Sequence, residues 1–360
     1  MSKRGLFYID WGLFIPCIIL ILINLVTLFS LNINLFKNEL LFVFVGLVVF
    51  FLFSQVHYKI PKLYGAPIYV ISLILLVVVL IIGVETRGSL RWVEIFGFRF
   101  QFSEILKPFL GISLAGYLSG NSKRNIKNFA KILFLMAPIA FLIFIQPDLG
   151  DALIYVFVTI FTLIFAGFSW YYFTVLILIV VLTAPIAWNF LHDYQKYRVL
   201  TFLDPSRDPL GKSYNAIQSM IAVGSGMFLG KGLGQGSQSE LRFLPERHTD
   251  FIFATISEQT GFVGSFLIVV CFIFLFYRII KISLNSNDQF SKFYSAICFF
   301  ILLMQFFINV GMNVGILPIV GVTLPFVSYG GSSMLSNFIM LGLLVSISRS
   351  IKEDNVLEIS

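Results

Sequence analysis

The sequence predicts an all-α membrane protein with about ten transmembrane helices. Of its 360 residues, 58% are hydrophobic and only 12% are charged, whereas soluble domains carry about 25% charged residues. The mean hydropathy is +0.93. A chain this apolar would expose large hydrophobic patches to water, so we expect lipid to surround it. A soluble enzyme, a coiled coil and a disordered chain are excluded, and we expect no nucleic-acid partner.

Ten apolar stretches are long enough to cross a bilayer, which takes about 17–25 residues. They cover residues 12–31, 38–56, 65–84, 103–120, 129–147, 149–167, 170–191, 250–280, 290–317 and 329–350. No repeat, low-complexity tract or linker divides them, so we interpret residues 1–360 as a single integral membrane domain.

The short loops between these stretches are basic on one side of the membrane. The cations on that side are Lys3, Arg4, Lys59, Lys62, Lys123, Arg124, Lys127, Lys131, Arg278, Lys281, Lys292, Arg349 and Lys352. The positive-inside rule then places both termini in the cytoplasm. Two segments face the outside: residues 85–102 and a large loop, residues 192–249, between the seventh and eighth helices.

The large outer loop carries cations that orientation does not explain, namely Lys196, Arg198, Arg207, Lys212, Lys231, Arg242 and Arg247. They are either solvated or bind an anionic ligand outside the membrane. The glycine-rich segment 224–236 does not match a phosphate-binding loop, because Ser225 and Gly232 stand where the motif needs a glycine and a hydroxyl. We expect a flexible loop or a close backbone approach there.

Polar residues are concentrated where the eighth stretch begins. Glu246, Arg247, His248 and Asp250 lie within five residues of one another. In one interpretation Thr249 caps the helix and Asp250 complements its dipole. In the other, desolvation raises the pKa of Asp250 and makes it a better general base near neutral pH. Two turns later, Glu258 would support it.

Ionisable residues inside the fourth span form a second candidate group. Glu104 and Lys107 are three residues apart and can pair on one helix face. Because charges within a span indicate function by default, Lys107 could instead point towards an anion held by Arg91. Asp148 is either the N-cap of the sixth helix or an acid at the mouth of an outer cavity.

Three further features complete the pattern. Cys17, Cys271 and Cys298 lie singly in apolar runs, which predicts small core residues. The histidines lie on separate segments, which disfavours a histidine metal cluster. Glycines and prolines between Asn309 and Ser333 predict broken backbone at membrane depth, which has to line protein or water.

With these motifs the chain resembles the SEDS family of cell-wall polymerases nearly from end to end. The segments that carry the resemblance are Gly88-Ser-Leu-Arg-Trp92, Phe102-Ser-Glu104 with Lys107, Gln146-Pro-Asp-Leu-Gly150, Arg198 to Pro205, Ile217 to Gly236, Pro245 to Phe253 and Leu324 to Ser333. Arg247 after Glu246 resembles the elongation-type members more than the division-type relatives. Phe102, Asp151 and Gln259 depart from the family pattern.

The resemblance implies a peptidoglycan glycosyltransferase in the bacterial cytoplasmic membrane, with its active site on the extracytoplasmic side. Such an enzyme joins lipid II units into a growing glycan strand for cell elongation and rod shape, and releases undecaprenyl pyrophosphate. Its implied partners are a class B penicillin-binding protein, which cross-links the strands, and the elongation machinery. The alternatives are a lipid II flippase, a division-type polymerase and a scaffold without activity.

The mechanism that follows makes Asp250 the catalytic base, which takes the proton of the acceptor GlcNAc 4-hydroxyl as it attacks the anomeric carbon of the donor with inversion. The expected substrate- and pyrophosphate-binding residues are Arg91, Glu104, Lys107, Arg198, Arg242, Arg247 and His248, because guanidinium groups suit phosphates. The expected supporting residues are Asp148, Glu246 and Glu258. A divalent cation, Mg²⁺ or Mn²⁺, could share this task, with Asp148 and Glu104 as candidate ligands.

Overall fold

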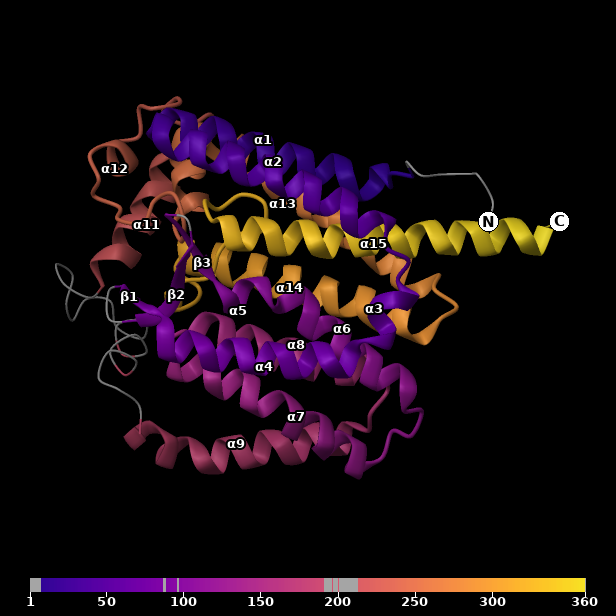
Figure 1. Cartoon of the computed structure of the whole chain (residues 1–360). Coiled ribbons are helices and arrows are strands. Elements are labelled where there is room, and N and C mark those ends of the chain that lie inside the picture. The colour runs from indigo at the N-terminus through magenta and orange to yellow at the C-terminus, as the bar shows by residue number, and fades with distance from the viewer. Residues whose placement is uncertain are drawn as a thin grey trace.

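The computed structural model describes residues 8–86, 89–95, 97–190, 196, 200 and 213–359. Long helices run side by side in a bundle (Figure 1), so the all-α prediction is confirmed. The first turns of α1 and the last turns of α15 lie at the same end of the bundle, and α11, α12 and a small sheet lie at the other. An even number of crossings places the two ends of a chain in this way.

Each of the ten predicted stretches contains a helix. The helices are α1 (Trp11–Leu31), α2 (Ile33–Gln55), α3 (Lys59–Leu63), α4 (Gly65–Ile82), α5 (Phe102–Ile105), α6 (Lys107–Gly120), α7 (Ile126–Ile145), α8 (Leu149–Phe165), α9 (Trp170–Phe190), α11 (Tyr214–Ser225), α12 (Ser237–Glu240), α13 (Ile252–Leu284), α14 (Gln289–Asn313) and α15 (Gly331–Ile359). Seven are long and apolar enough to span a membrane: α1, α2, α4, α7, α13, α14 and α15. Helices α8 and α9 contain shorter apolar stretches.

The outer segment before α5 forms an antiparallel sheet that the sequence did not predict. Its strands are β1 (Val84–Thr86), β2 (Ser89–Ile95) and β3 (Phe98–Gln101), in the order β1-β2-β3. Phe98 and Phe100 of β3 meet the ring of Phe42, with centroids 5.3 and 6.3 Å apart. The sheet therefore sits on the outer end of α2, and it presents Arg91 and Gln101 to the bundle.

Helix α13 is broken at Gly261 (φ 67°, ψ −157°). The glycine-rich loop forms hydrogen bonds with backbone groups on both sides of this break. The N–H groups of Phe262 and Val263, just below the break, donate to the carbonyls of Met227 and Phe228 at 2.9 and 3.3 Å. Above it, the carbonyls of Glu258 and Gln259 accept from the loop residues Lys231 and Gly232 at 2.9 and 3.0 Å. Both new helix ends are thereby satisfied. The expected close approach of this loop is confirmed.

Other sequence predictions concern the interior. All three cysteines are buried and unpaired, as expected. Residues 314–330 join α14 to α15 without regular helix, which confirms the predicted break in the backbone. This connecting segment, residues 314–330, is held by side chains of α1, α2 and α14, and it forms one wall of the candidate site described below.

The break at Gly261 gives a first testable prediction. A Cβ at this position would lie 2.3 Å from the backbone nitrogen of Gly230, and the positive φ adds strain of about 1–3 kcal/mol for any other residue. Gly261→Ala should therefore lower the thermal unfolding midpoint of the purified protein clearly. Gly224→Ala is the matched control, since a Cβ there meets nothing within 4 Å. Equal midpoints for the two variants would contradict the packing described.

Candidate active site

Asp250 lies where α13, α14 and the connecting segment meet, at the end of the bundle that carries α11 and α12. Helix α13 begins only at Ile252, so the expectation that Thr249 caps it is wrong. The cap comes from α14 instead: Asn313 Oδ1 accepts from the N–H of Ala254 at 3.1 Å. The amides of Asn309 and Asn313 both donate to the carbonyl of Asp250, at 3.1 and 3.0 Å. The backbone of Asp250 is thus fixed by two buried asparagines.

The half-buried side chain of Asp250 faces the connecting segment. Gly321 has a positive φ of 75°, and a Cβ there would lie 3.4 Å from Asp250 Oδ2. Asn309 also donates to the carbonyl of Val322 at 2.7 Å. One asparagine therefore ties Asp250 and this part of the segment together.

Lys107 lies on the other side of the connecting segment, between two carboxylates. Its Nζ is 2.7 Å from Glu104 Oε1 and 2.7 Å from Asp151 Oδ1, and its side chain is only 1% exposed. The predicted Glu104–Lys107 pair is confirmed. The alternative, in which Lys107 points towards an anion at Arg91, does not hold, because Asp151 takes the second side of the ammonium group.

Asp148 and Arg91 extend this ionic cluster towards the sheet. Asp148 caps α8, as predicted, by accepting from the N–H of Asp151 at 3.2 Å. Its other oxygen accepts from the amide of Gln101. Arg91 Nη1 lies 3.5 Å from Asp148 Oδ1. The cluster thus runs from the buried Lys107 to the partly exposed Arg91.

Residues 320–323 of the connecting segment separate Asp250 from the ionic cluster. Gly321 lies at Asp250, whereas the hydroxyl of Thr323 donates to Glu104 Oε1 at 3.4 Å. Val320 and Val322 pack on Gly150, where a Cβ would come within 2.8 Å of both residues. The segment is therefore wedged between the base candidate and the buried charges.

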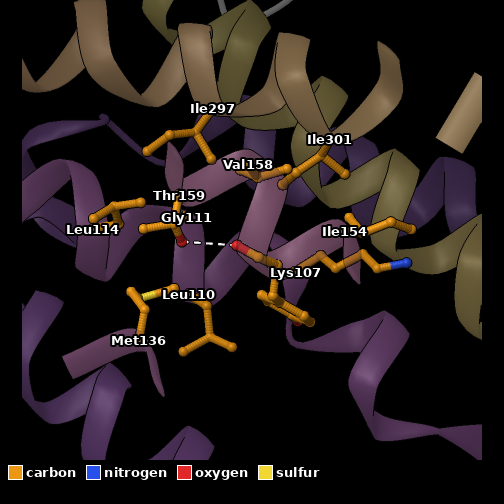
Figure 2. Close-up of a pocket in the computed structure, with 11 residues that line it drawn as sticks. Lys107, Leu110, Gly111, Leu114, Met136, Ile154, Val158, Thr159, Ile297 and Ile301 are labelled. Carbon is orange, nitrogen blue, oxygen red and sulfur yellow. Dashed lines mark hydrogen bonds between the residues drawn. The ribbon is translucent and has the colours of Figure 1, made fainter. Parts of the chain in front are cut away.

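A cavity of about 10 Å³ lies beside the stem of Lys107. It is lined mainly by apolar side chains, among them Leu110, Leu114, Met136 and Ile154 (Figure 2). Thr159 also lines it, and its hydroxyl donates a hydrogen bond to the carbonyl of Tyr155. This volume suits one water molecule at most. The cavity is therefore a packing defect under the cluster, too small for a substrate.

Two arginines offer donors to an anion. Burial lowers the pKa of Arg247; the nearby Glu240 opposes this shift, and the neighbouring Arg242 adds to it. Among the described residues, Arg247 Nη1 and Arg91 Nε are buried and find no hydrogen-bond partner. Arg242 is exposed on the same outer turn. Arg198 lies outside the described residues.

The remaining predicted residues contact the surrounding loops. The carboxylate of Glu258 accepts from the N–H groups of Gln238 and Ser239, both at 2.9 Å, and pairs with Lys231 at 3.0 Å. It therefore anchors the outer loop, in place of the direct support for Asp250 that its spacing suggested. Glu246 accepts from the hydroxyl of Thr249 at 3.2 Å. The ring of His248 packs edge-on against Tyr329 at 5.4 Å.

The geometry around Glu104 and Asp148 does not fit a divalent cation. The ammonium group of Lys107 occupies the space between Glu104 and Asp151, and Arg91 approaches Asp148. Within the described parts of the chain, no three His, Cys, Asp or Glu side chains gather as a metal site. Cationic side chains of the chain itself thus take the places that a metal would need at these two residues.

Several residues of the site escaped sequence reasoning. Asp151 was seen only as a departure from the family pattern, although it is the second partner of Lys107. Asn309 and Asn313 are one turn apart on an apolar helix, a spacing that could have marked a polar face. Gly321 was predicted only as part of the broken backbone between Asn309 and Ser333, because its place at Asp250 depends on a contact across 71 residues of sequence.

The ionic cluster gives a second prediction. Lys107→Met leaves two buried carboxylates facing each other, and breaking a buried pair costs about 3–5 kcal/mol. The pair of Lys62 and Asp288, at 2.8 Å, is the control, because its side chains are 35% and 29% exposed and solvent-accessible pairs contribute only about 0–1 kcal/mol. The midpoint temperature of thermal unfolding should fall much further for Lys107→Met than for Lys62→Met. A similar loss in both would contradict the cluster's role.

Comparison with known proteins identifies the family. The family model described as "Cell cycle protein", FtsW/RodA/SpoVE, matches residues 6–353. Peptidoglycan glycosyltransferase MrdB of Escherichia coli (strain K12) is 37% identical over 342 residues, which is 92% of this chain and 92% of that protein. Probable peptidoglycan glycosyltransferase FtsW of Wigglesworthia glossinidia brevipalpis is 36% identical and covers 86% of this chain and 82% of its own.

Solved structures agree with the sequence relatives. A chain of the structure "Structural coordination of polymerization and crosslinking by a peptidoglycan synthase complex" superposes with a TM-score of 0.84 at 29% identity, over 97% of this chain and 100% of that one. The rod shape determining protein RodA of Thermus thermophilus gives 0.73 at 25% identity, over 96% and 98%. With sequence, fold and site motifs in agreement, this chain belongs to the FtsW/RodA/SpoVE family, also called SEDS.

Proposed function

We propose that this chain is a peptidoglycan glycosyltransferase that polymerises lipid II on the outer face of the bacterial cytoplasmic membrane, with Asp250 as its general base. The observation that carries this proposal is the placement of Asp250: a half-buried carboxylate, three residues after Arg247, on a backbone fixed by Asn309 and Asn313. The names of the curated relatives support the same activity.

In the proposed reaction Asp250 takes the proton from the 4-hydroxyl of the acceptor GlcNAc. The hydroxyl oxygen forms a bond to the anomeric carbon of the donor, and the bond from that carbon to the phosphate oxygen breaks. Undecaprenyl pyrophosphate leaves with the electron pair, and the anomeric centre inverts. Partial burial favours this role, because a less hydrated carboxylate is a stronger base.

Arg247, with Arg242 beside it, is proposed to bind the departing pyrophosphate. A guanidinium group can donate two parallel hydrogen bonds to a phosphate, and Arg247 Nη1 has no hydrogen-bond partner among the residues described. Arg91 offers a second such donor from the sheet. Glu104 and Asp148 are not proposed as ligands of Mg²⁺ or Mn²⁺, since Lys107 pairs with Glu104 and Arg91 approaches Asp148.

The proposal extends to partners and cell location. One structural neighbour is part of a peptidoglycan synthase complex, which supports a class B penicillin-binding protein as the cross-linking partner of this chain. Arg247 and the likeness to MrdB and RodA support a role in elongation and rod shape. The basic short loops support cytoplasmic termini and an outward-facing site.

The third prediction tests the catalytic base. Native protein in liposomes should convert labelled lipid II into glycan polymer, and Asp250→Asn should lower the rate about 10²–10⁴-fold, the usual contribution of a general base. Asp288→Asn is the control, because it removes a carboxylate between α13 and α14 at the other end of the bundle. Polymer formation by Asp250→Asn at the native rate would refute the mechanism.

Additional arms of this assay separate the alternatives. Movement of lipid II across the vesicle membrane without polymer, with the penicillin-binding protein present and the protein folded, would identify a flippase. Rates measured with Mg²⁺, with Mn²⁺ and with EDTA report any metal dependence. If the apparent affinity for the metal changes in Asp148→Asn, the conclusion that this site excludes a cation is wrong.

The fourth prediction concerns Arg247. Replacement by lysine keeps the charge but removes the planar pair of donors, so kcat/KM for lipid II should fall about tenfold, which is about 1.4 kcal/mol. Arg99, which pairs with Glu94 at 3.9 Å and is 55% exposed, is the matched arginine on the outer sheet. Arg99→Lys should keep the native value. Unchanged kcat/KM in Arg247→Lys would remove this residue from the pyrophosphate site.

A further inference from the structure

Glu39 is a buried carboxyl that the proposed reaction does not use. It lies in the second turn of α2 and is completely buried, with 0% exposure. Its Oε2 accepts a hydrogen bond from the backbone N–H of Gly330 at 3.3 Å. Its Oε1 has no hydrogen-bond partner in the part of the chain that the structure describes. Burying an ionisable side chain within a membrane span is energetically costly, so such a residue indicates a functional role.

The surroundings of Glu39 show what it holds. Gly330 directly precedes α15, so the carboxyl also faces the positive end of that helix dipole. Phe42, one turn along α2, covers Gly331, where a Cβ would lie 2.3 Å from its ring. From α1, Asn24 donates to the carbonyl of Val327 at 2.5 Å. Helices α1 and α2 thus both bind the C-terminal end of the connecting segment.

The same stretch of the segment holds the residues next to Asp250. The N–H of Tyr329 donates to the carbonyl of His248 at 2.8 Å. The hydroxyl of Ser328 donates to the carbonyl of Thr249 at 2.8 Å. The backbone on the N-terminal side of Asp250 is therefore fixed by residues 328–329, and Glu39 binds the residue that follows them.

We propose that Glu39 is a positioning residue for the catalytic base. Through its hydrogen bond to Gly330 it fixes residues 328–330, which in turn fix the carbonyls of His248 and Thr249 and so the place of Asp250. This inference rests on the proposed function of Asp250. The hydrogen bond joins α2 to the residue before α15, across 291 residues of sequence.

The proposed role requires an acceptor oxygen at the right reach, and two substitutions separate reach from charge. Glu39→Gln keeps the length and the acceptor oxygen and cannot ionise. Glu39→Asp keeps the carboxyl but is shorter by one methylene, so it withdraws the oxygen from Gly330. A displacement of about 1 Å in a catalytic group can lower a rate about 10²-fold, so the shorter variant should be the impaired one.

The experiment measures lipid II polymerisation and amide hydrogen exchange on the same full-length preparations. We expect Glu39→Gln to keep kcat within about threefold, and Glu39→Asp to lower kcat about tenfold or more with little change in KM. Exchange in peptides covering 246–251 and 324–331 should speed up in Glu39→Asp only. Leu40→Ala, a change at an exposed neighbour, is the control and should alter neither readout.

Native kcat and native exchange in Glu39→Asp would overturn the proposal, and so would an equal loss of kcat in Glu39→Gln. If Glu39 only stabilised α15, the folded fraction would fall while kcat per folded molecule stayed native, which also contradicts it. Should Glu39→Asp not fold, Ser328→Ala breaks the same chain of hydrogen bonds at Thr249 and should give the same selective loss of kcat. A native protein without polymerase activity would refute the proposed function, whereas the exchange result would still test the positioning.

Discussion

Inside a bilayer a polar group finds no water, so its partners have to come from the protein itself. This constraint explains the least regular parts of the structure. The break in α13 at Gly261 is tolerated because the carbonyls of Met227 and Phe228 accept from the exposed N–H groups. The non-helical connecting segment is tolerated because side chains such as Asn309 bind its backbone. The irregular backbone near the site therefore keeps hydrogen-bond partners within the protein.

Two glutamates of membrane-spanning helices accept hydrogen bonds from N–H groups at the N-terminal ends of other helices. Glu258 of α13 accepts from the first N–H groups of α12, and Glu39 of α2 accepts from the residue before α15. In both cases a carboxylate from one helix satisfies the N-terminal end of another, where the helix dipole favours it. Side chains of α13 and α2 thus help to orient α12 and the start of α15. The loops around Asp250 are therefore positioned by the helix bundle.

The sequence was sufficient for most of the fold, because apolar stretches of spanning length and short basic loops are local features. It also located Asp250, Glu104 and Lys107, since charges at a lipid boundary are conspicuous. It missed the sheet at residues 84–101, whose strands are short and lie in a segment interpreted as a loop. It also misplaced Glu258, because spacing along one helix gives no information on which loop packs against it. Gly321 and Asp151 depend on contacts between distant segments.

The pairing of Lys107 has a consequence for how the protein enters the membrane. Helix α6 has only 14 residues and carries Lys107 at its start, and a charged side chain inside a membrane span is costly unless it is paired. Its second counter-charge, Asp151, is supplied by α8, a part of the chain that the ribosome makes later. The two-sided pairing of Lys107 is therefore complete only once α8 packs beside α5 and α6.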